Sequence, residues 1–252
     1  MESLNALIPL EHLEIHVMPI VHFKATASVS FWHRIGLEAL ARGPAGSPLR
    51  SPVALFAEAR AQGLEQLLDL ACLARALPLL RRMGSGQRLF VNVGPETLLH
   101  PRFMSTIETF LPTGSHSQLV LEVLEGPLED LPALTRVLTA VRELGIAVAI
   151  DDVSISEAEL ARVHQLPMAQ FLKIDREVMM GHWPDNPTHT REWLRELQRV
   201  AATRDAQVLM EGIEPAGRDL LVELNRLGVV HGQGFLFGAP SPHIPDEPPP
   251  AD

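Results

Sequence analysis

Two adjacent aspartates, Asp151 and Asp152, follow four apolar residues in the stretch AVAIDD. Two ionised carboxylates side by side repel one another, and burial raises the cost of that repulsion. A solvated turn removes the difficulty, and so does a hard divalent cation, because Mg²⁺ and Mn²⁺ prefer carboxylate, amide and water oxygens. The aspartate pair therefore indicates either a surface turn or a cation site.

Other apolar runs of the chain also end in polar residues. They supply Glu38 and Arg42, Asn92, Glu122 and Glu125, Lys173 and Asp175, Glu211 and Glu214, and Gln233. Any one of these acids alone is typical of a helix cap or a surface salt bridge, but the joint placement favours a metal site. Two ions about 3.5 to 4 Å apart are the usual arrangement for in-line attack on phosphorus. Asp151 and Asp152 can each face a different ion.

The apolar runs themselves predict the fold. Runs such as RLFVNV and QLVLEV are nearly continuous in apolar residues, which is typical of parallel strands covered on both faces. Helical segments separate them; for example, residues 52–62 have Ser51 as an N-cap and Gly63 beyond the end. This alternation favours an α/β protein with a (β/α)8 TIM-like barrel over an open doubly wound sheet, and it places the polar strand ends at one mouth.

Residues 1–242 are expected to form this single barrel domain, although two small domains are possible at this length. The long interval between Glu38 and Asn92 has room for an additional pair of helices. Residues 181–190 are expected to be an insertion between a strand and its helix. The proline-rich residues 243–252 are expected to be a mobile tail.

Composition excludes several classes of protein. The net charge of −10 argues against binding of DNA or RNA polymers, which need a basic surface. The lone Cys72 cannot form an internal disulfide and fits a reducing compartment. No stretch resembles a secretion signal or a membrane span, so we expect a cytoplasmic protein without membrane attachment. The 11 histidines show no metal-binding spacing.

Seven motifs in order carry a resemblance that covers about residues 13–242. LEALARG, LFVNV, LVLEVLE, AIDD, FLKIDR, MEGIE and GQGFLFGAPSP resemble the motifs of the EAL-domain family, bacterial signalling phosphodiesterases that hydrolyse cyclic di-GMP to linear pGpG. The resemblance implies a barrel whose first strand is antiparallel, two Mg²⁺ or Mn²⁺ ions and a homodimer.

The resemblance also implies roles for individual residues. The expected metal ligands are Glu38, Asn92, Glu122, Asp151, Asp152 and Glu211. Lys173, Glu211 and Glu38 would be catalytic, and Lys173 would position or deprotonate the attacking water. Arg42 would contact a substrate phosphate, and Gln233 would hold a metal-bound water or the substrate. Glu125 would anchor the loop after Asp152.

Phe235 and Phe237 each fit two roles equally well, barrel packing or a stacking platform for guanine. Lys173 and Asp175 could also simply pair with each other, and Glu214 fits a structural role as well as a functional one.

Three departures from the family pattern bear on activity. DDVSISEAE replaces a loop that usually reads roughly DDFGTGYSS, so two glycines are missing and a different loop path is expected. Met18 replaces the usual glutamine before Pro19, and Leu124 replaces a threonine.

We therefore predict a metal-dependent cyclic di-GMP phosphodiesterase. The alternative is a weak or inactive receptor that binds the dinucleotide, or a module that binds a regulatory protein partner. A third interpretation is a barrel metal-hydrolase acting on another phosphodiester.

Overall fold

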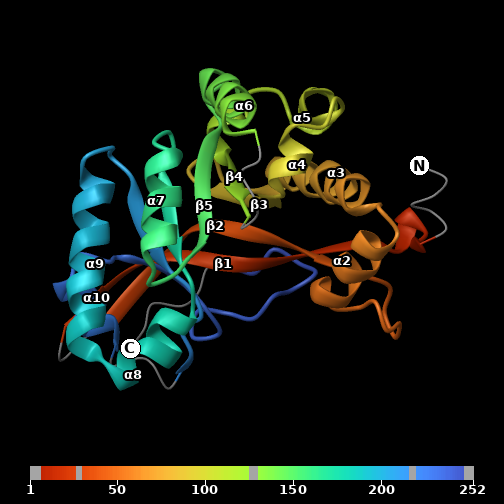
Figure 1. Ribbon diagram of the computed structural model, residues 1–252. Coiled ribbons are helices and arrows are strands. Elements are labelled where there is room, and N and C mark those ends of the chain that lie inside the picture. Colours follow the sequence, from red (N-terminus) through yellow and green to blue (C-terminus); the bar gives the residue numbers. More distant parts are fainter. Residues whose placement is uncertain (1–6, 27–29, 125–129, 216–219, 247–252) are drawn as a thin grey trace.

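The computed structural model describes residues 7–26, 30–124, 130–215 and 220–246. Within these residues, strands β1 to β8 close into a single barrel, and helices pack around its outside (Figure 1). The (β/α)8-type barrel expected from the alternation of apolar runs and helical segments is confirmed. The strands are β1 (Glu14–Ala25), β2 (Ser30–Arg42), β3 (Arg88–Val93), β4 (Leu119–Val123), β5 (Ala147–Val153), β6 (Phe171–Ile174), β7 (Gln207–Met210) and β8 (His231–Gln233).

The first strand runs against its two neighbours. In β1, Met18 lies opposite Glu38 of β2, and Ile20 lies opposite Gln233 of β8, both in antiparallel ladders. The remaining neighbouring strands pair in parallel. The reversal implied by the family resemblance is therefore present, and it leaves the carboxyl ends of β2 to β8 at one mouth.

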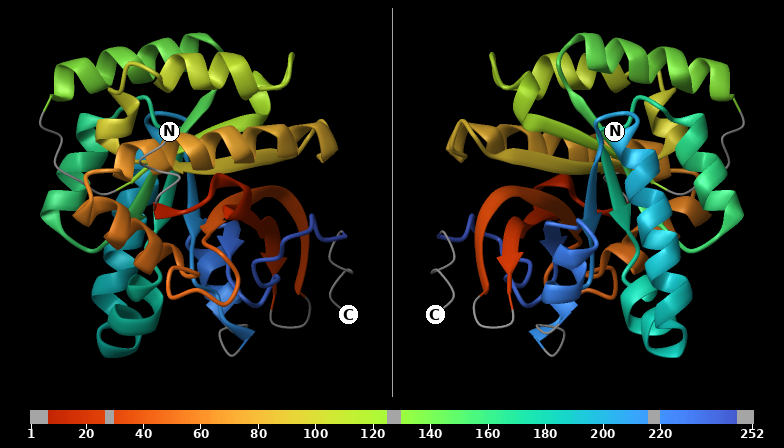
Figure 2. Two further views of the ribbon diagram at one scale, coloured as in Figure 1. Left: turned by 90° about the vertical axis from the view of Figure 1, so that its right-hand side faces the viewer. Right: turned by 90° about the vertical axis from the view of Figure 1, so that its left-hand side faces the viewer.

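Helices follow the strands and cover the barrel (Figure 2). They are α2 (Pro52–Ala61), α3 (Glu65–Ala76), α4 (Pro95–Leu98), α5 (Phe103–Phe110), α6 (Leu131–Glu143), α7 (Glu157–Gln165), α8 (Trp183–Asp185), α9 (Pro187–Ala202) and α10 (Leu220–Arg226). Shorter turns are 3₁₀ at Leu10–His12, Leu77–Arg82 and His116–Gln118, and π-helical at Val178–His182. Helices α2 and α3 occupy the interval where an additional pair was expected, and Ser51 Oγ accepts from the amide of Ala54 at 3.2 Å as the N-cap of α2.

Two apolar layers explain why the strands are apolar on both faces. Outward-facing residues such as Val91 and Val148 pack in a large core beneath the helices. A smaller cluster including Ile20, Phe90 and Phe171 is formed by the alternate residues of the strands and fills the barrel. This filling makes the barrel a packed scaffold, so that only its mouth is available for polar chemistry.

The segment predicted as an insertion and the start of the segment predicted as a mobile tail are both ordered in part. The insertion at residues 181–190 is largely helical, because Asn186 caps α9 by accepting from the amide of His189 at 3.2 Å and Pro187 begins the helix. At the start of the expected tail, Ile244 packs against the large core and the carbonyl of Pro245 accepts from Arg34. Residues 247–252 lie outside the described residues, so the tail stays a prediction. Among the described residues, no helix combines the length and the apolar character that crossing a membrane requires.

Candidate active site

Lys173 of β6 lies at the centre of the mouth, surrounded by carboxylates. Its Nζ atom is 2.8 Å from Glu122, 2.7 Å from Asp151, 2.7 Å from Glu211 and 3.8 Å from Glu38. The side chains of Lys173 and Glu122 are fully buried, at 0% exposure. Four different strands thus bring acidic groups within reach of one ammonium. The alternative in which Lys173 simply pairs with Asp175 does not hold, because Asp175 accepts from the amide of Glu177 at 2.9 Å instead.

Glu38 of β2 connects this cluster to the neighbouring strands. Its Oε1 atom accepts from Asn92 Nδ2 at 2.9 Å, and its Oε2 atom accepts from Gln233 Nε2. Glu38 and Gln233 are both buried. The carboxylate of Glu38 is therefore oriented by two amides from β3 and β8, and the structure brings these three predicted site residues together.

Asp151 and Asp152 both contribute to the mouth, although they are consecutive residues of β5. Carboxylate oxygens of Asp151, Asp152 and Glu211 lie within 4.8 Å of one another, an arrangement that could hold a metal ion. Asp152 has a positive φ of 53°, a conformation rare for residues other than glycine. This backbone conformation accompanies a shift in the register between β5 and β6. The solvated-turn interpretation is therefore wrong for Asp151, which is buried.

Burial and mutual repulsion dominate the electrostatics of the mouth. Burial raises the pKa of Glu122 well above its ordinary value, and the nearby carboxylates of Glu38 and Asp151 raise it further against the pull of Lys173. Burial likewise raises the pKa of Glu211 to about 8. Burial alone would lower the pKa of Lys173, but Asp151, Glu122 and the other acids outweigh it, so that its pKa is well above the ordinary value. Lys173 does not have the depressed pKa that would suit a proton acceptor when only these groups face it.

The donor set fits divalent cations. Two buried oxygens, Glu122 Oε2 and Gln233 Oε1, have no hydrogen-bond partner among the described residues, and such atoms are rare in proteins unless a ligand satisfies them. The five predicted carboxylate ligands and one lysine leave four negative charges uncompensated when all are ionised, which two divalent ions would neutralise. The ligand atoms are oxygens, as Mg²⁺ and Mn²⁺ require.

An open pocket continues from the acidic cluster to the surface. Its lining includes Met18, Glu214 and Phe235, together with Arg176, which sequence reasoning missed although it follows Asp175 in the quoted motif FLKIDR. Phe235 is 56% exposed, whereas Phe237 is 5% exposed and packs against Phe23 with ring centroids 6.2 Å apart. The two phenylalanines therefore separate into one surface residue at the pocket and one core residue.

Two predicted residues are not placed in this pocket. Arg42, at the end of β2, does not line it, and its Nη1 atom donates to the carbonyl of Ala41 at 2.8 Å. Glu125, the predicted loop anchor, lies outside the described residues.

Two glycines permit the close packing of the pocket wall. Gly212 has a φ of +64°, and a Cβ atom there would lie 2.3 Å from the Cβ of Arg176. Gly234 has a φ of +153°, and a Cβ atom there would lie 2.2 Å from the carbonyl oxygen of Ile213. The motifs MEGIE and GQGF thus owe their glycines to backbone geometry beside Glu211 and Gln233.

The loop after Asp152 reaches α7 without any glycine. Val153 is buried in the large core, and Ile155 packs against this core. Among the described residues outside glycine, only Asp152 and Asp205 have positive φ, so residues 153–155 follow an ordinary backbone path.

The fold and the site together define an α/β barrel with an acidic, oxygen-rich mouth suited to divalent cations. Comparison with known proteins identifies the family. A model of the EAL domain matches residues 3–240, so the chain belongs to the EAL domain family.

Relatives of the chain include a protein named as a phosphodiesterase of cyclic di-GMP. The cyclic di-GMP phosphodiesterase NbdA of Pseudomonas aeruginosa is 29% identical over 255 residues, which cover 96% of this chain and 30% of NbdA. A solved structure of the EAL enzyme Bd1971, with cAMP and cyclic di-GMP bound, matches with a TM-score of 0.77 and 25% identity over 95% of this chain and 65% of that chain. The chain spans about 30% of the length of the curated relatives it matches.

A further structure shares the fold and contains a metal. Klebsiella pneumoniae BlrP1, solved with manganese and cyclic di-GMP, matches with a TM-score of 0.73 and 24% identity over 91% of this chain and 56% of that chain. At this identity the likeness supports the barrel fold alone.

Proposed function

We propose that this chain is a metal-dependent phosphodiesterase that hydrolyses cyclic di-GMP to linear pGpG. The observation that carries the proposal is the convergence of acidic residues from separate strands on one buried point, with Lys173 within 2.8 Å of three of them. Membership of the EAL domain family supports the choice of substrate, because relatives such as NbdA are named as phosphodiesterases of this nucleotide.

The residues that would hold two Mg²⁺ or Mn²⁺ ions are Glu38, Asn92, Glu122, Asp151, Asp152 and Glu211. When bound, such ions lower the pKa of a coordinated water and neutralise charge on phosphate oxygens. The pair of amides on Glu38 would fix the direction of its carboxylate, and Gln233 Oε1 would accept a hydrogen bond from water or substrate.

The remaining residues bind and orient the nucleotide. Phe235 is exposed beside the pocket, where its ring can stack on a guanine. Arg176 lines the same pocket, and its planar guanidinium suits paired phosphate oxygens. Lys173 Nζ holds the carboxylates of Glu122 and Asp151 in position and is close enough to orient a water bound among them. Arg42 would contact phosphate only where the substrate extends beyond the described pocket.

A direct assay tests this proposal. Purified protein is incubated with cyclic di-GMP and either Mg²⁺ or Mn²⁺, and the nucleotides are separated by chromatography. We expect linear pGpG to accumulate, and we expect EDTA to stop the reaction. Ca²⁺ should inhibit, because its larger and looser coordination fits poorly a site built for Mg²⁺ geometry.

A cyclic di-GMP receptor is the second candidate, favoured by the altered segment 153–155 beside Asp152. Binding of cyclic di-GMP without linear product over several hours would reject the enzyme and support the receptor. The homodimer stays a prediction, which light scattering of the purified protein would test.

A further inference from the structure

A bulge in β5 brings two consecutive aspartates to the same site. In a regular strand, successive side chains face opposite sides of the sheet. Ile150 lies opposite Leu172 of β6, but Val153 lies opposite Ile174, so β5 has one residue more than β6 over this interval. The extra residue and the positive φ of Asp152 reorient the strand, as β-bulges do near functional sites. The usual alternation of side chains is therefore interrupted where Asp151 and Asp152 lie.

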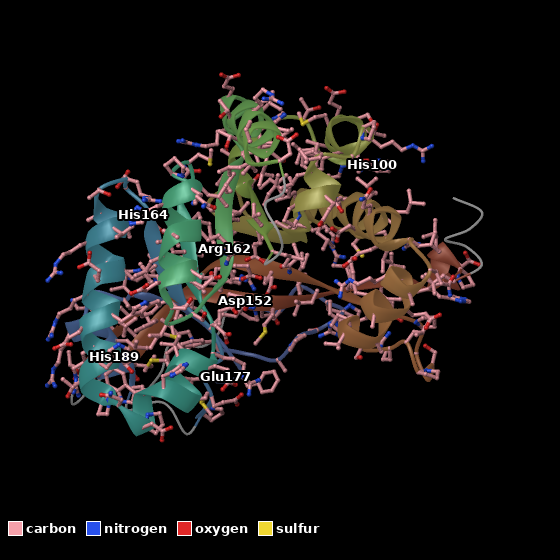
Figure 3. All side chains as sticks on the ribbon, viewed as in Figure 1. His100, Asp152, Arg162, His164, Glu177 and His189 are labelled. Atoms are coloured by element: carbon pink, nitrogen blue, oxygen red, sulfur yellow. The ribbon has the colours of Figure 1, made fainter. Side chains whose placement is uncertain are left out.

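Arg162 of α7 contacts the backbone of this bulge. Its Nη2 atom donates to the carbonyl oxygen of Asp151, and its Nε atom donates to Glu159 Oε2 at 2.9 Å. Arg162 is only 7% exposed. Figure 3 labels Arg162 beside β5 and Asp152 just below it, where α7 and β5 approach one another. A side chain from the following helix thus holds the strand at the residue where its register shifts.

The geometry of arginine makes this contact a rigid one. The guanidinium is planar, so the bond to Glu159 and the bond to the Asp151 carbonyl fix one another's direction. The amide of Glu159 is in turn held by Ser156 Oγ at 3.1 Å, at the N-cap of α7. The Nη1 atom of Arg162 has no hydrogen-bond partner among the described residues, and a buried unpaired donor reduces stability. Arg162 therefore connects the first turns of α7 to the backbone of the β5 bulge.

We infer that Arg162 is a positioning residue that holds the β5 bulge so that Asp151 and Asp152 both present their carboxylates to divalent cations at the mouth. The inference rests on the proposed function, because it assumes that these carboxylates bind metal. It assigns to α7 a role in metal affinity, although none of its residues belongs to the predicted ligand set.

The test compares Arg162 with a second arginine that contacts the same helix. Arg204 Nη1 donates to the carbonyl of Val163, the residue after Arg162 in α7, at 2.7 Å and not to the backbone of β5. Mn²⁺ binding to the full chain is measured by calorimetry, without nucleotide, for the wild type, Arg162→Met and Arg204→Met. Loss of an outer contact that orients a metal ligand typically weakens metal binding about 10- to 100-fold. We expect this loss for Arg162→Met, wild-type affinity for Arg204→Met, and partial recovery for Arg162→Lys.

The outcomes separate the inference from the proposed function. A folded Arg162→Met variant with wild-type Mn²⁺ affinity would overturn the role of Arg162 and leave the proposed function standing. Equal weakening by Arg204→Met would also overturn it, because any disturbance of α7 would then suffice. A wild type that binds no Mn²⁺ would reject the proposed function and this inference together.

A second variant covers the case in which Arg162→Met does not fold. Glu159→Gln keeps the size of the side chain but removes the charge that orients Arg162, and we expect a loss of Mn²⁺ affinity of about 3- to 10-fold, smaller than that for a lost outer contact. If the Glu159→Gln variant and the Arg162→Lys variant each bound Mn²⁺ with wild-type affinity, the inference would be contradicted.

Discussion

The two ends of the barrel carry ionisable groups of opposite character. At the mouth, Glu38 and the neighbouring acids surround Lys173. At the other end, which we call the floor, His33 of β2 and His231 of β8 lie directly opposite His22 of β1, and Arg88 begins β3 nearby. The barrel thus carries an anionic cluster at one end, to which β2, β4, β5 and the residue after β7 contribute, and an imidazole cluster beside a cation at the other.

The floor has the opposite electrostatic character, because Arg88 lies near His231 and its histidine neighbours. The rings of His22 and His231 have centroids 5.2 Å apart, and a ring nitrogen of each lies 3.4 Å from the other. Burial lowers the pKa of His231, and the neighbouring His22 and Arg88 add to this effect, so that its pKa is about 4. A neutral imidazole carries no charge that attracts a cation, and the guanidinium of Arg88 repels one, whereas uncompensated carboxylates attract the hard cations Mg²⁺ and Mn²⁺. The difference shows that one barrel can carry an anionic cluster and a cationic one. The side chains at each strand end, and not the strands themselves, set the local charge.

Removal of Glu38 should have the largest effect on the mouth. In Glu38→Ala, Asn92 and Gln233 lose their common partner and the metal loses a ligand, so we expect Mn²⁺ affinity and turnover each to fall by more than the roughly 100-fold seen for outer contacts. Calorimetry and the product assay measure the two effects. Glu65→Ala, which removes an exposed partner of Arg60, is the control and should behave as the wild type. Wild-type rates in Glu38→Ala would show that the ligand set is wrong.

Replacement of Lys173 should reveal the repulsion at the mouth. Lys173→Met leaves buried carboxylates without their ammonium, and breaking a buried ion pair in this way costs about 3–5 kcal/mol of unfolding free energy. Added Mn²⁺ should restore most of this loss, because a cation returns to the acids. Urea unfolding with and without Mn²⁺ measures the effect.

Arg88→Met is the matched variant at the floor. It removes a cation that lies 5.0 Å from the ring centroid of Phe171, and Mn²⁺ should not compensate for its loss. An equal response of both variants to Mn²⁺ would contradict the contrast between mouth and floor.

Asp69 of α3 allows the effect of burial on a carboxyl group near the mouth to be measured as a change in stability with pH. It accepts from the amide of Gly94 at 2.8 Å, two residues beyond Asn92, and burial raises its pKa to about 6. A carboxyl whose pKa is raised on folding stabilises the protein at low pH, and this stability is lost as the pH rises from about 4 through 6. A shift of about two pKa units corresponds to about 3 kcal/mol of unfolding free energy. Asp69→Asn should therefore gain stability relative to the wild type over this range and keep the gain at pH 7. A difference in urea midpoints that does not change with pH would contradict this.

His231 should show the smallest effect, with the opposite sign. Its pKa is lowered on folding, so the wild type should lose stability as the pH falls from about 6.5 to 4. Because the ring is partly exposed, we expect the loss of unfolding free energy to be about 2 kcal/mol, less than the full pKa shift would give. His231→Gln should remove this acid sensitivity and leave Mn²⁺ affinity at pH 7 unchanged. Weaker Mn²⁺ binding in His231→Gln would mean that the floor and the mouth are coupled.

The sequence predicts the strands well, because a strand buried on both faces consists almost entirely of apolar residues. The run RLFVNV coincides with β3, and the acid or amide at each strand end reaches the mouth. The antiparallel β1 is different, since its direction leaves no trace in an apolar pattern and came only from the family resemblance.

The parts of the site that the sequence could not predict depend on local departures from regular geometry. A period-two rule places Asp151 and Asp152 on opposite faces, and the bulge that unites them is visible only in the register of β5 and β6. Arg162 lies in a helix with many charged residues, where an arginine is normally solvated, and its burial depends on how α7 packs against β5. Arg176 could have been noticed, because it lies two residues beyond the end of β6, a strand whose lysine was already assigned.

The proposed activity requires that the mouth bind two divalent cations through Glu38 and the acids around Lys173. The most direct measurement is the number of Mn²⁺ ions bound per chain in the presence of cyclic di-GMP, obtained from the electron paramagnetic resonance signal of free Mn²⁺. We expect two bound ions in the wild type and a loss of binding in Glu38→Ala. A wild type that leaves all Mn²⁺ free, or a Glu38→Ala variant that binds as many ions as the wild type, would contradict it.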